Sequence, residues 1–189
     1  EMQRSLVGSE MCIRDSDEAM LPTRGGDWYD GGLWQNLFLH NWGTKNDLVK
    51  GSWDYLYKVI AQANQSLDKL KEILENNPEN ISVPKYISEV RAFRAMYYYY
   101  LLDMFARVPL VTSSSVAMED VVQSERSAVF NFVRTELEES VEDLSDAHSN
   151  LTGEYYGRIT KPVAYFLLAK LALSLIHISE PTRLRCISY

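Results

Sequence analysis

Apolar side chains recur at helical spacing most densely in residues 88–110, where they cover most of the circumference of the predicted helix. Its narrowest apolar face comprises Tyr86, Val90, Phe93, Tyr97, Leu101 and Met104. A helix that is apolar nearly all round packs between other helices, so we expect an inner helix here. We expect it to stop at Val108, because Pro109 disfavours the α conformation of the residue before it.

Four consecutive tyrosines lie in this predicted inner helix. Helical spacing places Tyr97 toward the core, Tyr98 and Tyr100 beside it, and only Tyr99 on the polar side. The same polar side carries Ser88, Arg91 and Asp103. For all but Tyr99, packing in the core is the favoured interpretation over a binding motif.

An amphipathic helix is predicted before the inner helix, over residues 52–76. Ser52 is its expected N-cap, and the Asn-Asn-Pro sequence at 76–78 ends it. Trp53 lies on the apolar stripe of this helix and is expected in the core. Because the following connection is short, the two helices should form an antiparallel hairpin.

A second helical hairpin is predicted after an extended or irregular segment at residues 110–125. Its helices are expected to begin at the N-caps Ser127 and Thr160, and Pro162 is tolerated in a first turn. The apolar positions are Phe130, Val133, Leu137, Val141 and Leu144 in one helix, and Val163, Phe166, Leu167 and Leu171 in the other. Two hairpins in series predict an all-α fold of helical hairpins arranged as in an α-solenoid, an α-α superhelix with long irregular loops.

Charged residues of these helices are expected to be structural. The glutamates Glu136, Glu138, Glu139 and Glu142 are assigned to the solvated face of their helix, as charge runs usually are. We expect Arg91, Arg94 and Arg158 to pair with carboxylates of neighbouring helices rather than to bind an anion.

The segment before the helices, residues 17–50, is rich in Gly, Trp, Asp and Asn and has no sustained periodicity. Glycine pairs at 25–26 and 31–32 predict turns, and one helical turn is expected around residues 33–39. Long loops that carry their own aromatic residues are often functional or act as a lid.

The candidate ligand-binding residues lie in this aromatic segment: Trp28, Trp34, Trp42, Asp27 and Asn46. A sugar ring stacks its C–H face on a flat aromatic side chain, while amides and carboxylates pair with its hydroxyls. The alternative is that the tryptophans anchor a long loop to the helices beneath it.

Both ends of the chain have the sequence expected of translated DNA adapter. Residues 6–16 and 173–183 are encoded by DNA strings that are reverse complements over almost their whole length, as in a transposase-type sequencing adapter. We therefore expect residues 1–16 and 174–189 to be adapter-derived, and residues 17–173 to be a partial helical domain.

Setting those ends aside changes what the composition implies. Both cysteines lie in these end segments, so the remaining chain has none. Only His40 and His148 remain, too few for a histidine-built metal site, so no metal and no cofactor are predicted. The remaining 15 basic and 22 acidic residues give a charge of −7, which disfavours nucleic acid as a partner. No apolar run is long enough to cross a membrane.

No catalytic residue is predicted. A glycosidase holds two carboxylates on opposite sides of the scissile bond. Asp27 and Asp30 lie in a loop, and the glutamates at 136–142 lie on a predicted solvated face. No Gly-rich phosphate loop, Ser/His/Asp set or metal cluster is evident in the sequence, so an enzyme is disfavoured.

The order of these segments resembles the SusD/RagB family of surface-exposed, nutrient-binding outer-membrane lipoproteins. The resemblance rests on Asp-Trp-Tyr-Asp-Gly-Gly-Leu-Trp at 27–34 and on the segments at 53–64, 89–95, 105–110 and 157–171. Ala106-Arg107 departs from the Gly-Asp that the family often has before its hydrophobic-Pro-Leu sequence, and Pro162 stands where a small residue is common.

The resemblance implies a non-enzymatic protein of tetratricopeptide-like hairpins that captures oligosaccharides or other nutrients at the cell surface. It implies a TonB-dependent transporter of the SusC type as partner, and attachment to the outer membrane only through a lipid on an N-terminal cysteine upstream of this chain. The alternative from the helical hairpins themselves is a protein–protein interaction scaffold.

Overall fold

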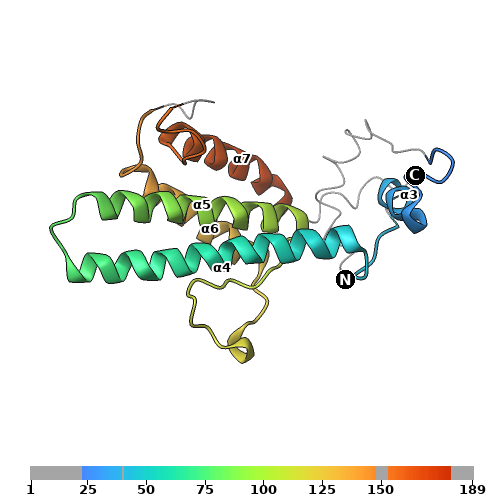
Figure 1. Cartoon of the computed structure of the whole chain (residues 1–189), viewed down its shortest axis with the longest axis horizontal. Coiled ribbons are helices and arrows are strands. Elements are labelled where there is room, and N and C mark those ends of the chain that lie inside the picture. Colours follow the sequence, from blue (N-terminus) through green and yellow to red (C-terminus); the bar gives the residue numbers. More distant parts are fainter. Residues whose placement is uncertain (1–22, 40, 148–152, 180–189) are drawn as a thin grey trace. The chain divides into compact units, whose positions relative to one another are not determined.

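The structure is a computed structural model that describes residues 23–39, 41–147 and 153–179 (Figure 1). It contains η1 (Asp30–Gly32), α3 (Leu33–Phe38), α4 (Asp47–Asn76), α5 (Ser82–Phe105), η2 (Met118–Asp120), α6 (Arg126–Val141) and α7 (Lys161–Ser179). The all-α prediction is confirmed: within the described residues extended pairing is limited to two isolated bridges, Arg24 with Asp27 and Pro109 with Gln123.

The chain divides into two compact units, residues 1–55 and 56–189, which are described separately. Residues 1–16, expected to be adapter-derived, lie outside the described residues, as do 180–189 of the C-terminal adapter segment. His40 and His148 also lie outside them.

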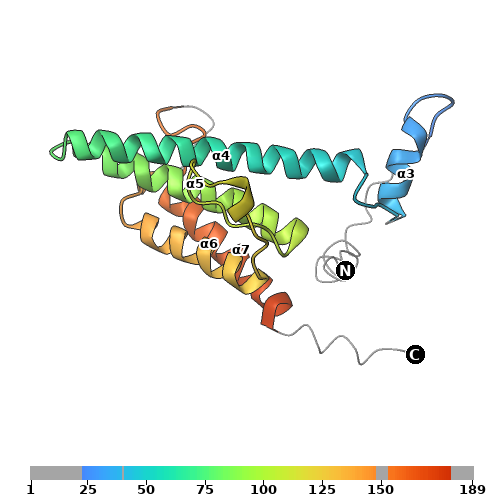
Figure 2. The same cartoon turned by 90° about the horizontal axis from the view of Figure 1, so that it is seen from below.

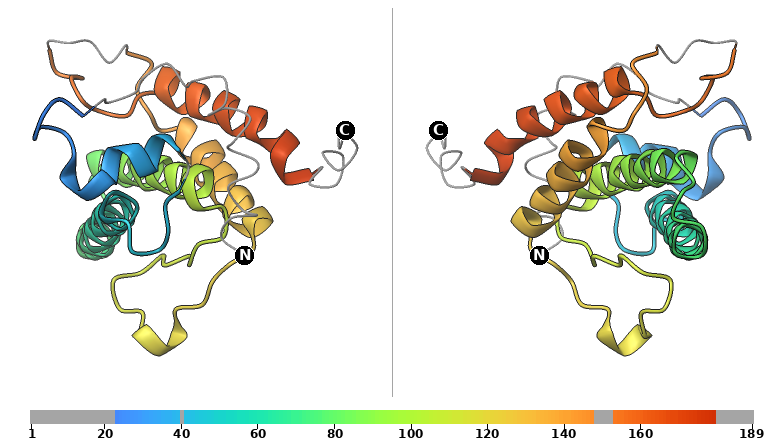
Figure 3. Two further views of the ribbon diagram at one scale, coloured as in Figure 1. Left: turned by 90° about the vertical axis from the view of Figure 1, so that its right-hand side faces the viewer. Right: turned by 90° about the vertical axis from the view of Figure 1, so that its left-hand side faces the viewer.

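The C-terminal unit consists of two helical hairpins packed side by side. Helices α4 and α5 run antiparallel through a short connection, and α5 packs against both α6 and α7 (Figures 1 and 2). Viewed along the helices, α5 lies between α4 and the α6–α7 pair (Figure 3). The prediction of an inner helix is confirmed, because α5 is covered on two sides.

The face that α5 buries differs from the prediction. Tyr98 and Tyr99 are buried and Tyr97 is only half-buried, whereas Tyr86 and Met104 are exposed. Tyr99 was assigned to the polar side with Ser88, and both assignments are wrong. A helix that is apolar all round has no unique apolar stripe, so its orientation is set by polar groups that find partners.

Helix α5 ends at Phe105, three residues before the predicted stop. Ala106 has φ 61° and ψ −65°, and the Arg107 N–H donates to the Phe105 carbonyl at 2.8 Å. This is a γ-turn, a strained conformation for a residue with a Cβ atom. The buried Ala106 therefore terminates the helix before Pro109 acts.

None of the three side chains predicted as N-caps caps its helix. Asn46, not Ser52, caps α4: its Oδ1 accepts from the Leu48 and Val49 N–H groups at 3.0 and 3.2 Å. The Thr160 hydroxyl, expected to cap α7, is buried without a hydrogen-bond partner. Helix α6 begins at Arg126 with Glu125 at its N-cap position, two residues before the predicted N-cap Ser127.

Side-chain burial in the second hairpin follows the prediction at most positions, although Val163 of α7 is only half-buried. The predicted face of α6 is buried, and Leu167 and Leu171 of α7 are buried as expected, but Phe166 is exposed. Glu136, assigned to the solvated face, is buried. Trp53 of α4, expected in the core, is half-buried.

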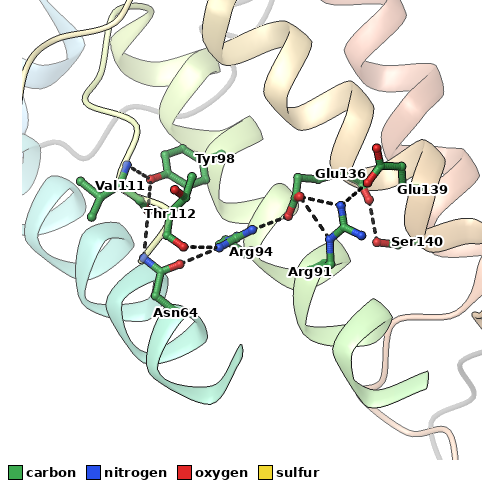
Figure 4. A network of polar contacts seen from close by, with 9 residues as sticks. All are labelled: Asn64, Arg91, Arg94, Tyr98, Val111, Thr112, Glu136, Glu139 and Ser140. Carbon is green, nitrogen blue, oxygen red and sulfur yellow. Dashed lines mark hydrogen bonds and ion pairs between the residues drawn. The ribbon is translucent and has the colours of Figure 1, made fainter. Parts of the chain in front are cut away.

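Glu136 is buried because it belongs to a polar network centred on Arg94 (Figure 4). Arg94 Nη2 contacts Glu136 Oε2 at 2.5 Å, and its Nη1 donates to Asn64 Oδ1 at 2.8 Å and to the Thr112 carbonyl at 3.0 Å. Arg91 donates to the other oxygen of Glu136 and to Glu139. The predicted structural pairing of Arg91 and Arg94 is thus confirmed, and it joins α4, α5 and α6.

The network also fixes the start of the long connection between α5 and α6, which projects from the helices (yellow in Figure 1). Tyr98 donates to the Val111 carbonyl at 2.9 Å and accepts from the Val111 N–H at 2.8 Å. Asn64 Nδ2 donates to the same carbonyl, and Tyr57 donates to the Pro109 carbonyl. Apart from the single bridge between Pro109 and Gln123, side-chain bonds therefore take the place of backbone pairing at the start of this segment.

Burial shapes the protonation of these groups. Burial raises the pKa of Tyr98 to about 12 and also raises that of Tyr57, where the nearby Tyr98 adds to the effect. Burial alone would lower the pKa of Arg91, but its hydrogen bonds to Glu136 and Glu139 outweigh that and raise it. The tyrosines therefore stay neutral and Arg91 charged across the physiological pH range.

Candidate functional site

The candidate site is the aromatic turn at residues 24–34 of the N-terminal unit. Arg24 and Asp27 pair through both backbone groups at 3.1 and 3.0 Å, which closes a tight turn over Gly25 and Gly26. Gln35 on α3 donates to the Thr23 hydroxyl at 2.8 Å, so the start of the turn is tied to the short helix that follows.

Trp28 and Trp34 meet within this turn. Their ring centroids lie 6.0 Å apart at an interplanar angle of 65°, the edge-to-face arrangement that aromatic pairs prefer. Trp34 Nε1 donates to Asp30 Oδ2 at 2.7 Å. The hydrogen bond fixes the plane of one indole, and the ring contact then restricts the other.

The Trp28 side chain stays accessible in this arrangement. Trp28 is 49% exposed and the neighbouring Tyr29 is exposed as well, while Trp34 is half-buried. An accessible indole whose orientation is restricted offers a flat apolar face at low entropic cost to a ligand. The turn has the geometry of a stacking platform.

The backbone of the turn is strained where these side chains attach. Trp28 has φ 61° and Asp30 has φ 41°, values that are uncommon for residues other than glycine, and Gly31 and Gly32 follow at 66° and 82°. Each residue other than glycine in such a conformation costs on the order of 1–3 kcal/mol of stability, and residues of this kind cluster at functional sites. The strain is retained where it brings Trp28 and Trp34 together.

The structure brings only part of the predicted set together. Trp28 and Trp34 form the pair, whereas the exposed Asp27 contributes its backbone to the turn. Asn46 caps α4 with the Oδ1 that we expected to meet a ligand hydroxyl. Trp42 is half-buried in the same unit.

Asp30 is the residue that the predicted ligand set omitted. Its carboxylate accepts the Trp34 indole N–H and so holds one of the predicted tryptophans. Asp30 lies in the left-handed turn before α3, so its contact with Trp34 follows from the turn and not from a shared helix face.

None of the histidine, cysteine and acidic side chains of the described residues gather into a group of three or more able to hold a metal ion. Among the helices that the structure describes, none combines the length and apolar character needed to cross a membrane.

Comparison with known proteins identifies relatives over most of the chain. A SusD-like protein of Bacteroides ovatus is 24% identical over 153 residues, which are 80% of this chain and 27% of that protein. SusD-like protein P38 of Formosa agariphila is 26% identical over 121 residues, covering 62% of this chain and 23% of the relative. The chain thus spans about a quarter of the curated relatives that it matches.

Solved structures show the same helical arrangement. A laminarin-binding SusD-like protein aligns with a TM-score of 0.68 and 28% identity, covering 79% of this chain and 31% of the other. A SusD-like carbohydrate-binding protein of Bacteroides fragilis aligns with a TM-score of 0.62 and 27% identity, covering 70% and 25%.

The family model described as "Starch-binding associating with outer membrane" matches residues 17–173. That range contains the Trp28–Trp34 pair and both helical hairpins. The chain therefore belongs to the SusD-like family.

Proposed function

We propose that the protein represented by this chain binds an oligosaccharide at the surface of the outer membrane without cleaving it. The observation that carries the proposal is the accessible Trp28 ring held against Trp34, whose indole is fixed by Asp30. A pyranose ring stacks on such a face through its C–H groups. Two structural relatives named for laminarin and carbohydrate binding support the ligand class.

The proposal assigns ligand contact first to Trp28 and Trp34 and second to Trp42, Asp27 and Asn46. Asp30 is a positioning residue, because its carboxylate acts on the ligand only through the Trp34 indole. Its engagement with Trp34 also disfavours a catalytic role, since a general acid or nucleophile of a glycosidase needs its carboxylate directed at the glycosidic bond.

The cellular setting of the proposal comes from the family. The family is associated with the outer membrane, which supports a surface-exposed lipoprotein held by an N-terminal lipid. Delivery of the sugar to a TonB-dependent transporter of the SusC type is the further step that we propose for the whole protein.

Calorimetric titration of the chain with neutral oligosaccharides, β-1,3-glucans foremost, tests the function. Trp28→Ala and Trp34→Ala should each weaken binding about threefold to tenfold, the scale of one aromatic stacking contact. Leu39→Ala is the matched control, because Leu39 is an exposed apolar residue of the same unit without an aromatic face. Chromatography of the sugar after incubation should show it intact.

Two outcomes would contradict the proposal. Release of shorter sugars, abolished by substitution of Asp27 or Asp30, would make the chain an enzyme. Absence of binding to every oligosaccharide, together with tight binding of a protein partner, would favour the interaction scaffold that helical hairpins also provide.

A further inference from the structure

A second group of aromatic side chains lies on the helical unit, where the loop before α7 meets α5; Tyr86 in it is exposed and Tyr155 is half-buried. We call Tyr86, Glu89, Tyr155 and Arg158 the tyrosine–arginine cluster. The Arg158 guanidinium lies 5.9 Å from the Tyr86 ring centroid and 5.2 Å from that of Tyr155. Its Nη2 donates to Glu89 Oε1 at 2.5 Å and its Nε to Glu89 Oε2 at 3.2 Å.

The ion pair confirms the structural role predicted for Arg158, but it does not account for the aromatic surface. Tyr86 is 47% exposed, and Tyr156, next to Tyr155, is 64% exposed. A tyrosine that served only to cover the arginine would bury most of its ring against it. Here almost half of the Tyr86 side chain remains open to solvent, with its orientation restricted by the guanidinium.

Polar groups suited to sugar hydroxyls lie around these rings. Glu89 uses one contact on each oxygen, and a carboxylate oxygen accepts more than one hydrogen bond. Arg158 Nη1 lies 4.0 Å from the Glu154 carboxylate, which is beyond hydrogen-bond distance. A hydroxyl placed between Nη1 and Glu154 would accept from one and donate to the other.

The charge of the surroundings selects the class of ligand. Glu89 compensates the charge of Arg158, and Glu154 adds a further negative charge. An acidic sugar would meet a net negative surface, whereas a neutral sugar meets aromatic rings, two acceptors and one donor. The cluster is therefore suited to a neutral pyranose.

From this geometry we propose that the tyrosine–arginine cluster is a second carbohydrate contact of the protein, with Tyr86 as its stacking face. The inference rests on the proposed function and extends it to the helical unit. Arg158 and Glu89 orient the sugar through its hydroxyls, and Tyr155 also contacts the guanidinium. No residue of this contact belongs to the Trp28–Trp34 pair.

The test is calorimetric titration of the chain with a neutral β-1,3-glucan hexasaccharide and with an oligogalacturonate of equal length. Tyr86→Ala should weaken binding of the neutral sugar about threefold to tenfold, and Tyr86→Phe should retain it, because the aromatic face remains. Tyr100→Ala is the matched control: Tyr100 is 40% exposed on the same helix, fourteen residues or roughly 21 Å along its axis. Thermal melts of all variants separate a loss of binding from a loss of fold.

Each result decides the matter. If Tyr86→Ala binds like Tyr100→Ala while Trp28→Ala still weakens binding, the cluster is a structural tie and only this inference fails. If the acidic sugar binds more tightly through Tyr86, the neutral ligand class is wrong. If neither sugar binds the unsubstituted chain, the proposed function fails and this inference with it.

Discussion

The buried network around Arg94 and the exposed turn around Trp34 use the same kind of bond for opposite purposes. In both, a side-chain N–H donates to a carboxylate, from Arg94 to Glu136 and from Trp34 to Asp30. The first bond lies in the core, where an unpaired charge would be strongly destabilising. The second lies in solvent, where its loss costs little stability but releases an aromatic ring. Burial therefore decides whether such a bond supports the fold or a site.

Removing the buried cation should produce the largest effect. We expect Arg94→Met to destabilise the protein by about 3 kcal/mol, because Glu136 loses its most buried partner while Asn64 and the Thr112 carbonyl lose a donor. Urea denaturation followed by circular dichroism measures it. Arg134→Ala is the control, since its exposed pair with Glu138 should contribute about 0.5 kcal/mol or less.

A double variant tests whether the unpaired charge of Glu136 causes this loss of stability. Arg94→Met combined with Glu136→Leu removes both charges, so it should recover part of the lost stability. If Arg94→Met alone costs less than about 1 kcal/mol, the network is solvated and the contrast with the aromatic turn is lost.

Alkaline pH should also destabilise the protein through this network, by slightly less than Arg94→Met does. The pKa of Tyr98 is raised to about 12 by burial, so the folded state holds the phenolic proton that an unfolded tyrosine loses near pH 10. Stability from this group is complete below pH 10 and falls as pH rises toward 12, by about 2–3 kcal/mol. Tyr57 acts with the same sign.

Urea denaturation at a series of pH values measures this loss. Tyr98→Phe should reduce its slope between pH 10 and 12, at the cost of leaving the Val111 carbonyl and N–H with fewer partners at every pH. An unchanged slope in Tyr98→Phe would assign the alkaline loss to other groups.

A third prediction concerns the strained end of α5. Ala106→Gly should stabilise the protein by about 1 kcal/mol, because glycine adopts the positive φ of Ala106 without a Cβ clash. Ala169→Gly is the matched control on α7, where an exposed alanine in a helix interior should lose about 1 kcal/mol. Destabilisation by Ala106→Gly, measured in thermal melts, would mean that this turn carries no strain.

The comparison also explains what the sequence could predict. Hairpin order, the inner position of α5 and the pairing of Arg91, Arg94 and Arg158 were predicted, because apolar periodicity and compensating charges are local properties of the sequence. The face that α5 buries could not be predicted in this way. Tyr99 lies in the core because Tyr98, Arg94 and Ser88 of the same helix each form a hydrogen bond with a residue far away in the sequence. The burial of Glu136 was missed for the same reason, because its partners Arg91 and Arg94 lie on another helix.

Predictions of the candidate site depended on backbone conformation. Trp28 and Trp34 were predicted by residue type, but their contact follows from positive φ values at Trp28 and Asp30, which no rule of propensity favours there. Asn46 has a role that its residue type did not reveal. Its side-chain oxygen caps the N-terminus of α4, whereas the sequence pattern predicted only contact with a ligand.

The smallest effect on stability is expected in the aromatic turn. Asp30→Gly removes the acceptor of Trp34 Nε1 without adding strain at positive φ, so the free energy of unfolding should change by less than about 0.5 kcal/mol. The Trp34 indole N–H should instead exchange with solvent about fivefold faster, as expected for the loss of one hydrogen bond. Heteronuclear NMR resolves that proton from those of the other indoles.

Asp27→Asn is the control for Asp30→Gly, because Asp27 contributes its backbone groups to the turn while its carboxylate lies exposed. It should leave the Trp34 exchange rate unchanged. If Asp30→Gly instead destabilises the protein as much as Arg94→Met does, the turn is part of the folding core, and the division between a buried bond for the fold and an exposed bond for the site fails. If neither exchange nor stability changes, the Trp34–Asp30 bond is not populated in solution, and Trp28 loses the support on which its stacking role depends.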